Sequence, residues 1–401
     1  MVTVTYDIIT VGGGIAGSSL AKAMAEQGAK VLVLERDSVF RDRVRGEAIM
    51  PWGTAEAKEL GIYDCIMASG GRDLPWWDGY QGSERTSHRD LTATTTPKEA
   101  VTAFYHPTVQ ECLMQAAADA GAEIRRGVRV VGVQTDGSPK VVAEVDGCDT
   151  EFRARLVVGA DGRDTPFRRW AGFDVQRDPG HTLVAGLLLD DVPVADDTSH
   201  AWLNPELGLW VLIFPQGGGR VRGYVCYGEA AGFRLTGEED VPRFIEESIK
   251  AGMPESCYAN AKPSGPLATF DGAASWVDHP YRNGIALIGA AGGAPDPTWG
   301  QGLSLTLRDV RVLRDALLQH NDWEGAGNAY AEERDRYYKV LHDVELWETD
   351  LLMETGQKAD ARRAKAFAAW REDRTRQLDV LLSGPLPAMD ENTKRRFFGE
   401  E

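Results

Sequence analysis

The chain has 401 residues, with 44 Lys and Arg against 61 Asp and Glu, and so a formal net charge of −17. Hydrophobic residues make up 43% and charged residues 26% of the sequence, which is the balance of a globular protein with a sizeable core. Nucleic acids and anionic membranes require a basic protein face, so the acidic excess argues against both as partners.

The cysteines and the chain termini favour a cytoplasmic protein. The chain has five cysteines: Cys65, Cys112, Cys148, Cys226 and Cys257. They are scattered, odd in number and without a Cys-x-x-Cys pair, which is typical of reduced thiols. No apolar stretch approaches the about 18 residues that a membrane helix needs. The N-terminal segment also lacks the basic stretch and cleavage site of a signal peptide.

The first elements along the chain predict a β-α-β unit. Residues 6–11 are a β-branched apolar run that ends in glycines. Residues 15–27 are Ala-rich with a helical pattern, and Gly28 ends them. Residues 30–34 form a second apolar run. Two buried strands around one helix predict a parallel sheet.

The next segment, up to residue 180, mixes helices and strands. Two helices are predicted, over residues 51–60 and 107–120. Three strands are predicted, over residues 128–134, 140–145 and 151–158, with a hairpin turn at Asp136 and Gly137. Residues 70–98 are polar and rich in Trp, Gly, Ser and Thr, and indicate an excursion of strands and loops.

An antiparallel sheet with one covered face is predicted from about residue 181 to 270. Its strands are predicted over residues 183–189, 210–214 and 221–227, with a helix over 242–250. A buried strand over 284–289 and a helix over 303–319 follow. Residues 326–382 are almost entirely helical in pattern, with Gly356 as a breaker.

A glycine-rich motif with the spacing G-x-G-x-x-G follows the first predicted strand and opens the first predicted helix. Gly12 permits the tight turn, Gly14 lets a pyrophosphate approach the backbone, and Gly17 lets helix and strand pack closely. Ile15 and Ala16 begin the helix, whose N-terminus offers free N–H groups and a positive dipole end to phosphates.

An acid follows the glycines at the spacing that ribose binding requires. Glu35 ends the second predicted strand, about 20 residues after the first glycine. Arg36 beside it is a further candidate ligand. A glycine-rich turn that binds nothing is the competing interpretation, but strand, spacing, helix and acid together predict an adenine dinucleotide. The charge of Glu35 disfavours NADP in this site, because it would repel a 2′-phosphate.

Three further segments occur in a family-specific order. They are RVRGE at 43–47, GADGR at 159–163, and GAAG at 289–292 with DPTWGQG at 296–302. Their order resembles the single-component FAD-dependent aromatic hydroxylases, the para-hydroxybenzoate hydroxylase-like family (group A), over about residues 4–325. The resemblance implies an FAD-dependent monooxygenase that takes NAD(P)H as co-substrate.

The resemblance implies contacts to FAD for several residues. Arg45 is similar to the arginine that lies along the FAD, and Asp161 with Gly162 is similar to a pair near the pyrophosphate. His106 stands where the family has a polar contact to the ribityl chain. The loop beside the flavin ring would stabilise negative charge at N1/O2 through backbone N–H groups. Its expected contact residues are Pro297, Gly300, Gly302 and Leu303.

Plain structural roles remain open for the same residues. Arg45 fits a surface ion pair, and Asp161-Gly162 fits an ordinary turn. His106 fits a helix-entry residue, and Asp296 fits a helix cap. Ala290 departs from the family, which has an aspartate at that position to hold a ribityl hydroxyl. One charge-assisted hydrogen bond, worth about 1.5–3 kcal/mol, is therefore missing.

The chemistry implied by the resemblance belongs to the flavin. Reduced FAD and oxygen form a C4a-hydroperoxide that hydroxylates an aromatic, phenol-like secondary metabolite, and water must be excluded from it. The pocket is expected between the inserted sheet and the flavin loop. Candidate pocket residues are Trp299, Pro297, Trp210 and Tyr224. An ordinary role in the hydrophobic core is the alternative for the aromatic residues among them. The sequence does not decide which face of the sheet meets the flavin, and it assigns no catalytic base.

Alternative functions share parts of this pattern. A two-component enzyme of the epoxidase or halogenase type would take FADH2 from a partner flavin reductase. The halogenase motif WxWxIP is only partly matched at Trp210–Pro215. A reductase of isoprenoid double bonds shares the first motif, but the net charge weighs against a lipid substrate. The last alternative is a flavoprotein fold with weakened or lost FAD binding, as Ala290 signals.

The predicted fold class is α/β. It has a Rossmann-like FAD-binding domain of the GR2 type, an inserted and mostly antiparallel β-sheet substrate domain, and a helical C-terminal segment. The FAD-binding domain is expected over residues 1–80, 98–180 and 281–325, the substrate domain over 81–97 and 181–280, and the helical segment over 326–401.

Overall fold

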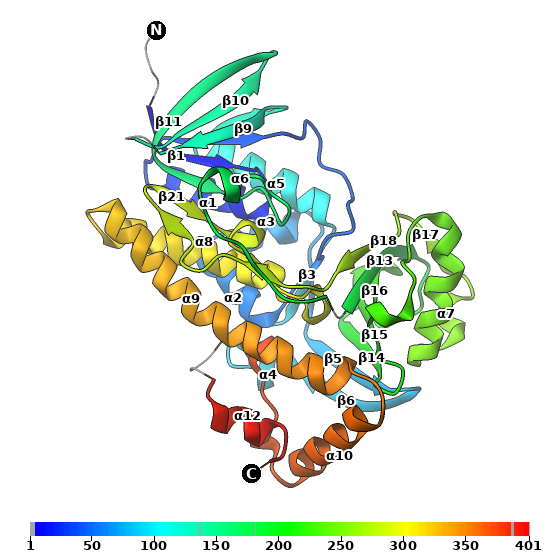
Figure 1. Cartoon of the computed structure of the whole chain (residues 1–401). Coiled ribbons are helices and arrows are strands. Elements are labelled where there is room, and N and C mark those ends of the chain that lie inside the picture. Colours follow the sequence, from blue (N-terminus) through cyan, green and yellow to red (C-terminus); the bar gives the residue numbers. More distant parts are fainter. Residues whose placement is uncertain (1–4, 136–137, 181, 386–388, 401) are drawn as a thin grey trace.

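The first part of the fold is built around a mostly parallel sheet (Figure 1). The computed structural model describes residues 5–135, 138–180, 182–385 and 389–400, so the hairpin turn expected at Asp136 and Gly137 lies outside the described residues. The strand order is β20 (Tyr281–Arg282), β21 (Ile285–Leu287), β11 (Cys148–Gly159), β1 (Thr5–Val11), β2 (Val31–Glu35), β8 (Glu123–Arg126). Every residue of β2 is buried, because layers cover both faces of the sheet.

Helices cover one face of this sheet and a hairpin covers the other. The helices are α1 (Ile15–Ala25), α5 (His106–Asp119), α8 (Gly302–Gln319) and α9 (Trp323–Glu348). Leu20, Leu113 and Leu313 bring three of these helices into one core. On the opposite face, Phe152 and Phe167 join the core beneath the hairpin of β9 (Arg129–Gln134) and β10 (Lys140–Val145) and the helix α6 (Phe167–Trp170).

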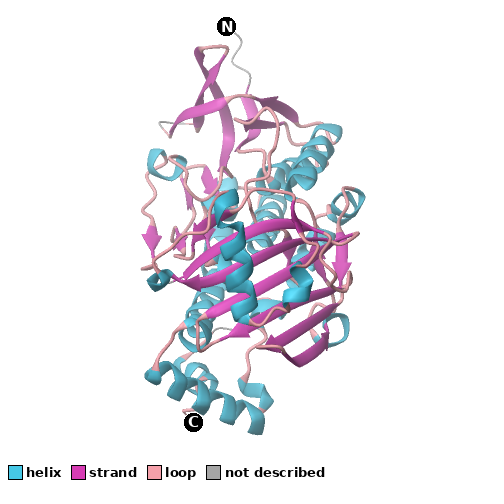
Figure 2. Ribbon diagram, turned by 90° about the vertical axis from the view of Figure 1, so that its right-hand side faces the viewer, coloured by secondary structure: helices cyan, strands magenta, loops and turns pink. Residues whose placement is uncertain are grey.

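A second sheet forms the inserted layer. Its order is β17 (Lys262–Pro263), β13 (Thr182–Asp190), β16 (Arg220–Gly228), β15 (Leu209–Gly217), β14 (Thr198–Asn204), β5 (Trp76–Gln81), β6 (Glu84–Asp90), and β18 (Ala268–Asp271) also pairs with β13. All pairs are antiparallel except β14 with β5. The helix α7 (Val241–Ala251) lies across its outer face and buries Phe244 there (Figure 2). The sheet already includes Trp76, ahead of the expected boundary at residue 81.

Helices at the C-terminus bridge the two sheets. The segment η6 (Thr349–Met353), a π-helical turn, continues α9, and α10 (Gln357–Glu372), α11 (Val380–Ser383) and α12 (Glu391–Phe397) follow. Gly356 separates η6 from α10 with a φ of 94°, a backbone conformation that suits glycine. Leu341 and Trp347 share a core with Phe214 of the inserted sheet. The α/β fold class with a helical C-terminal region is therefore confirmed.

Short elements connect these layers. Two further sheets have three strands each. One has the strand order β3 (Ala48–Ile49), β7 (Val101–Ala103), β4 (Arg72–Leu74). The other has the order β12 (Gln176–Arg177), β19 (Ser275–Trp276), β22 (Gly293–Ala294). The remaining α-helices of the described residues are α2 (Pro51–Glu59), α3 (Tyr63–Ala68) and α4 (Leu91–Thr94). Among the described helices, none has the length and apolarity to cross a membrane.

Two cysteines correct the expectation of five reduced thiols. Cys65 in α3 and Cys112 in α5 form a disulfide, with 6.2 Å between their Cα atoms. The sequence alone does not predict this disulfide, because the two cysteines are 47 residues apart and only the packing of α3 on α5 brings them together. Cys148, Cys226 and Cys257 are free.

Candidate functional site

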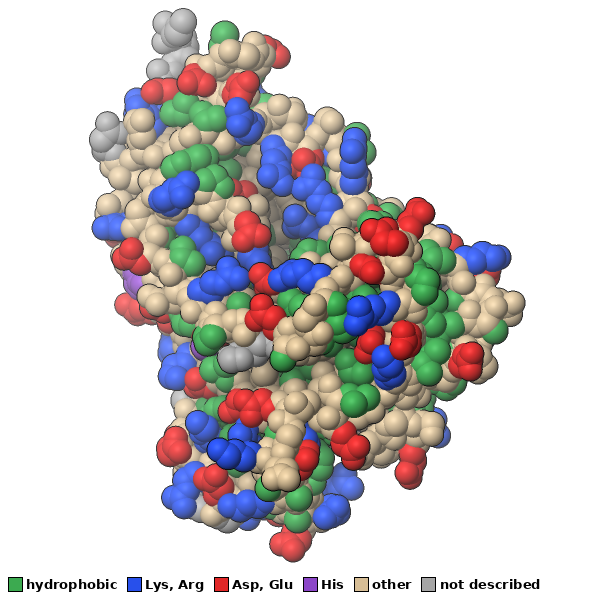
Figure 3. All heavy atoms as spheres, turned by 45° about the vertical axis from the view of Figure 1, so that its right-hand side comes forward, with side chains coloured by type: hydrophobic (Ala, Val, Ile, Leu, Met, Phe, Trp, Pro, Cys, Tyr) green, Lys and Arg blue, Asp and Glu red, His purple; other side chains and the backbone are tan. Residues whose placement is uncertain are grey.

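A solvent-open groove lies where the first three parallel strands end. It lies at the carboxyl ends of β1, β2 and β11, which is the edge where such sheets bind ligands, and its volume is about 1270 Å³ with the adjoining open solvent included. The space-filling view shows this hollow with Lys and Arg side chains around it (Figure 3). Seven of the residues predicted to contact the cofactor line it: Gly12, Gly14, Glu35, Arg36, Arg45, Asp161 and Gly162.

The glycine loop allows its neighbours in the fold, and a ligand in the groove, to approach its backbone closely. Gly12 has a φ of +101°, and a Cβ there would stand 2.5 Å from the carbonyl oxygen of Ala160. A Cβ on Gly17 would stand 1.9 Å from the carbonyl oxygen of Gly12, so helix α1 packs directly on the loop. A Cβ on Gly14 would meet nothing nearer than Gln110, 3.5 Å away. The loop therefore leaves its backbone at Gly14 accessible from the groove.

Glu35 is a fixed carboxylate at the end of β2. Its Oε2 accepts a hydrogen bond from the backbone N–H of Gly13 at 2.7 Å, and its Oε1 accepts one from that of Asp37 at 2.7 Å. The residue is 7% exposed. Each carboxylate oxygen can accept more than one hydrogen bond, so these contacts hold Glu35 and still leave acceptor positions for ribose hydroxyls.

Arg45 is a cation that the described residues leave without a side-chain partner. Burial lowers the pKa of Arg45, and the nearby Arg43 and Arg36 lower it further, because the three guanidinium groups gather in one concave surface. Arg43 is paired with Asp37 at 2.9 Å, whereas solvent reaches Arg45 through the open groove. This excess of positive charge is suited to an anion such as a pyrophosphate.

Asp161 supplies a hydrogen-bond acceptor in the same groove. Its Oδ2 accepts from the hydroxyl of Thr165, while its buried Oδ1 has no partner in the described part of the chain. Burial raises the pKa of Asp161 to about 6. A buried acceptor without a donor fits a ligand hydroxyl. The glycine cradle, the unpaired Arg45 and this oxygen together fit an FAD molecule laid along the groove.

His106 is the first residue of α5 and contacts Gly46 and Glu47, outside the lining of the groove. Its Nδ1 is 2.9 Å from the carbonyl oxygen of Gly46, and its backbone N–H donates to Glu47 at 2.9 Å. Burial lowers the pKa of His106 to about 4, so the ring is neutral near pH 7. A Cβ on Gly46 would be 3.6 Å from Leu303, so the segment also contacts the start of α8.

The segment at Ala290 is held by an arginine that sequence reasoning did not assign. The buried Arg168 donates from Nε to the carbonyl oxygen of Ala291 at 2.6 Å and from Nη2 to that of Ala290. Gly289 donates its N–H to the buried Asp309 of α8 at 2.8 Å. The backbone here is therefore fixed by side chains of this chain, and Ala290 does not line the groove.

The loop at Pro297 is a single 3-10 turn before α8. Asp296 caps this turn by accepting from the N–H of Thr298 at 2.9 Å, so the cap considered for Asp296 belongs to the turn and not to α8, whose N-cap is Gln301. Gly300 follows with a φ of 70°, and Gly302 begins α8. The structure thus places Pro297, Gly300, Gly302 and Leu303 at a helix N-terminus, outside the lining of the groove.

The strand register decides which face of the inserted sheet meets this loop. Trp210 pairs with Cys226 and Leu212 with Tyr224, so these side chains share one face. The rings of Trp210 and Trp299 meet edge-on at 4.8 Å between centroids. The expected pocket residues Trp299, Trp210 and Tyr224 lie in one apolar cluster, which Met353 of the C-terminal segment joins.

A buried ion pair joins the inserted sheet to the segment that carries Arg45. Arg222 donates from Nε to Glu47 at 2.8 Å and from Nη2 to Asp42 at 2.7 Å, and both Arg222 and Glu47 are 0% exposed. Tyr224 donates its hydroxyl to the carbonyl oxygen of Arg45 at 2.9 Å. Glu47 belongs to the RVRGE segment that the sequence analysis noted. Only the position of β16 in the folded sheet identifies Arg222 as its partner.

Comparison with known sequences finds one family model and several relatives. The model described as FAD binding domain matches residues 5–343. Squalene epoxidase 2, mitochondrial, of Arabidopsis thaliana is 26% identical and covers 78% of this chain and 54% of its own length. Rifampicin monooxygenase of Rhodococcus hoagii is 28% identical and covers 82% of this chain and 67% of its own. The chain thus spans between about half and two thirds of these curated relatives.

Comparison with solved structures finds the same fold. The p-nitrophenol 4-monooxygenase PnpA from Pseudomonas putida superimposes with a TM-score of 0.79 and 21% identity, and the match covers 96% of this chain and 100% of that one. The anhydrotetracycline hydroxylase OxyS from Streptomyces rimosus gives a TM-score of 0.73 at 20% identity, over 96% and 78% of the two chains. At these identities the likeness concerns the fold.

Proposed function

The chain belongs to the FAD binding domain family, and from this membership we propose that it is an FAD-dependent monooxygenase that hydroxylates an aromatic, phenol-like small molecule. NAD(P)H is the proposed source of electrons and O2 the proposed oxidant. The observation that carries the proposal is the groove in which Gly14, Glu35, Arg45 and Asp161 converge. Bound FAD would supply the activation of oxygen.

The residues of the chain would bind the cofactor and keep water away. Arg45 would pair with the pyrophosphate, and Glu35 and Asp161 would accept from sugar hydroxyls. The ring of Trp210 on the inner face of the sheet and the ring of Trp299 in the loop at Pro297 together form an apolar wall. An aromatic substrate would pack against such rings in an edge-to-face or offset arrangement.

A two-component enzyme that receives FADH2 from a separate reductase is the second candidate. Its support is Ala290, which cannot accept a ribityl hydroxyl as an aspartate does, in a segment whose carbonyl groups already bind Arg168. Weak retention of oxidised FAD would follow. The similarity to curated squalene epoxidases makes epoxidation the corresponding reaction class.

A flavin titration separates these candidates. The purified protein is mixed with excess FAD and desalted, and its visible spectrum is recorded. We expect the two flavin bands near ~370 and ~450 nm to survive desalting and NAD(P)H oxidation to accelerate with a phenol. Loss of oxidised flavin on desalting and no NAD(P)H oxidation, but substrate oxygenation when a flavin reductase is added, would favour the two-component enzyme. Failure to bind either oxidised or reduced FAD would disprove both.

A further inference from the structure

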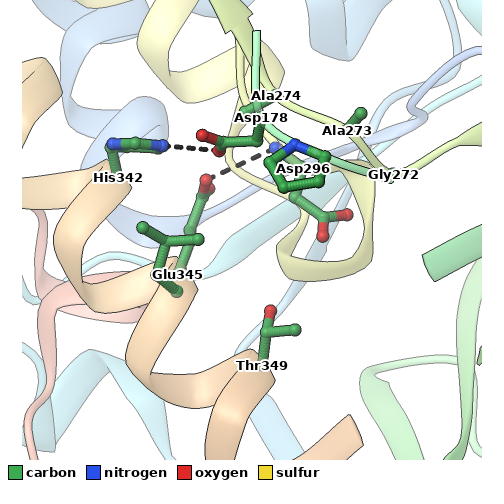
Figure 4. A pocket seen from close by; sticks show the side chains of 10 residues that line it. Asp178, Gly272, Ala273, Ala274, Asp296, His342, Glu345 and Thr349 are labelled. Carbon is green, nitrogen blue, oxygen red and sulfur yellow. Dashed lines mark hydrogen bonds and ion pairs between the residues drawn. The ribbon is translucent and has the colours of Figure 1, made fainter. Parts of the chain in front are cut away.

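Outside the groove, the described residues form a small pocket between α9 and the loop residue Asp296 (Figure 4). It has room for about one water molecule, which is too little for an organic ligand. Its polar residues hold the loop instead. Glu345 accepts a hydrogen bond from the backbone N–H of Asp296 at 3.3 Å, and Thr349 accepts one from the indole of Trp299 at 3.0 Å. The pocket therefore belongs to the packing of α9 and η6 on the loop, and the reactive group outside the groove is a disulfide.

This disulfide lies at the solvent-facing edge of the contact between α3 and α5. Cys65 and Cys112 are both half-buried. On α5, Thr108, Cys112 and Gln115 share one helix face, and both Thr108 and Gln115 are exposed. On α3, the neighbouring Asp64 is exposed as well. The bond is therefore within reach of a molecule that approaches from solution.

Helix α3 has few other anchors. It is six residues long, and Ile66 is the one buried residue in it. Tyr63 donates its hydroxyl to Asp73 at 2.5 Å, and the carbonyl oxygen of Ser69, just after the helix, accepts from the hydroxyl of Thr108 at 3.1 Å. A helix of this length is not stable in water by itself. The covalent bond to α5 is therefore a principal tether of α3.

Helix α5 is held by the hydrophobic core and does not need the bond. Seven of its residues are buried, and Val109 and Leu113 among them are 0% exposed. It also supports the nucleotide groove, because Gln110 lines the groove and a Cβ on Gly13 would stand 2.3 Å from Met114. Opening of the disulfide should therefore loosen α3 and leave α5 and the glycine loop in place.

We propose that the disulfide of Cys65 and Cys112 is an exchange site for a protein dithiol of the Cys-x-x-Cys type, and that its reduction turns α3 into a locally unfolded segment. A thiolate of the partner attacks one sulfur, the S–S bond breaks, and the leaving cysteine takes up a proton. The second thiol of the partner then displaces the mixed disulfide. The chain gains two electrons and two protons, and the partner is left as its own disulfide, which can reverse the exchange. The inference goes beyond the proposed oxygenation and does not depend on it.

The other three cysteines do not offer this chemistry. Cys226 is 0% and Cys257 is 8% exposed, and burial raises the pKa of both thiols, so they stay protonated and react slowly. Cys148 is exposed but has no disulfide partner. It is therefore a matched control for an accessible cysteine that takes no part in the exchange.

Thiol counting and trapping on the full chain test the exchange. Protein prepared without reductant and then denatured should show three thiols, and folded protein incubated with dithiothreitol, freed of it and denatured should show five. A Cys-x-x-Cys protein whose second cysteine is changed to serine should form a stable mixed disulfide with the chain. Cys65→Ser should abolish this adduct, and Cys148→Ser should leave it unchanged.

Hydrogen–deuterium exchange of the oxidised and the reduced parent protein measures the consequence for the fold. On reduction, amide exchange in residues 61–70 should accelerate about tenfold or more, whereas residues 106–119 should keep their protection. Tm should fall by several degrees, because the unfolded chain is no longer cross-linked.

Three results would overturn the proposal. The first is five thiols in protein prepared without reductant that persist after incubation with oxidised dithiothreitol. The second is a bond that opens only after the chain has been denatured. The third is equal amide exchange of residues 61–70 in both states. Because these measurements use no flavin and no turnover, their failure is distinct from a failure of the flavin titration.

Discussion

At the scale of single residues, the groove depends on polar atoms that their own chain leaves unsatisfied. Folded proteins pair most buried polar groups, so an exception indicates a missing partner. The Oδ1 of Asp161 is such an exception, and beside it in the groove the exposed guanidinium of Arg45 has no side-chain partner among the described residues. Glu35, by contrast, is fixed by two backbone N–H groups before any ligand arrives. One cation and two acceptors thus define the polarity of the expected ligand.

Removal of the unpaired cation should weaken FAD binding. Arg45→Ala deletes a charge-assisted contact worth about 1.5–3 kcal/mol, so the Kd for FAD should rise about tenfold to a hundredfold. Quenching of flavin fluorescence measures this Kd without turnover. Arg336→Ala, an exposed arginine on α9, is the control and should bind like the parent protein. An unchanged Kd in Arg45→Ala would show that this arginine serves a surface role.

At the scale of elements, the inserted sheet is attached to the nucleotide groove through strand β16. Arg222 on that strand reaches Glu47, and Glu47 also accepts from the side chain of Gln216 at 2.6 Å and from the backbone of His106. The segment with Arg45 therefore lies between the two layers. Its position depends on the register of β16 as much as on its own sequence.

Breaking this buried pair on one side should be costly. Arg222→Met leaves the buried Glu47 and the partly buried Asp42 without their cation, and we expect it to lower the free energy of unfolding by about 3–5 kcal/mol. The double variant Arg222→Met with Glu47→Gln should recover part of the loss, because the stranded charge is gone. Urea denaturation of the single and double variants measures both. A double variant no more stable than Arg222→Met would contradict a direct coupling.

At the scale of the whole molecule, the C-terminal helices hold the layers together and bury acids between them. The long helix α9 contacts the core of the parallel sheet through Tyr330 and the inserted sheet through Leu341 and Trp347. Thr349, after its end, accepts a hydrogen bond from the indole of Trp299 at 3.0 Å. The C-terminal segment, which follows the last recognised sequence motif, therefore completes the region around Trp299.

Burial of Glu348 should make the stability of the whole chain fall with rising pH. Burial raises the pKa of Glu348 from 4.5 to about 8, so the folded state holds a proton that the unfolded state releases. This contribution is complete below pH 4.5 and decreases until about pH 8, by at most about 1.4 kcal/mol for each pH unit. Glu348→Gln should therefore raise Tm at pH 8 relative to the parent and change it little at pH 5.

The comparison of the two proteins needs thermal unfolding at both pH values. Glu354→Gln, an exposed acid beyond the end of α9, is the control and should show no such difference. A Tm difference between parent and Glu348→Gln that is equal at pH 5 and pH 8 would rule out the titration of this carboxyl group as its cause.

The sequence by itself determined the local features that bind a dinucleotide. The glycine spacing, the Glu35 position and the apolar runs of β1 and β2 follow from short-range rules, because a turn, a helix start and a buried strand each need particular residues nearby. The FAD assignment and the expected roles of Arg45 and Asp161 came from the resemblance to the aromatic hydroxylase family. Most helix bounds and the character of the inserted sheet also followed from local patterns.

Tertiary structure alone decided which distant residues meet. The pairing of Arg222 with Glu47, the cystine of Cys65 and Cys112, and the contact of Trp299 with Thr349 join residues between 47 and 175 positions apart. Strand register selects one face of the inserted sheet, since a shift by one residue would turn Trp210 away from the loop. Packing also raised the pKa values of Glu345 and Glu348, because these values depend on burial that no local pattern encodes.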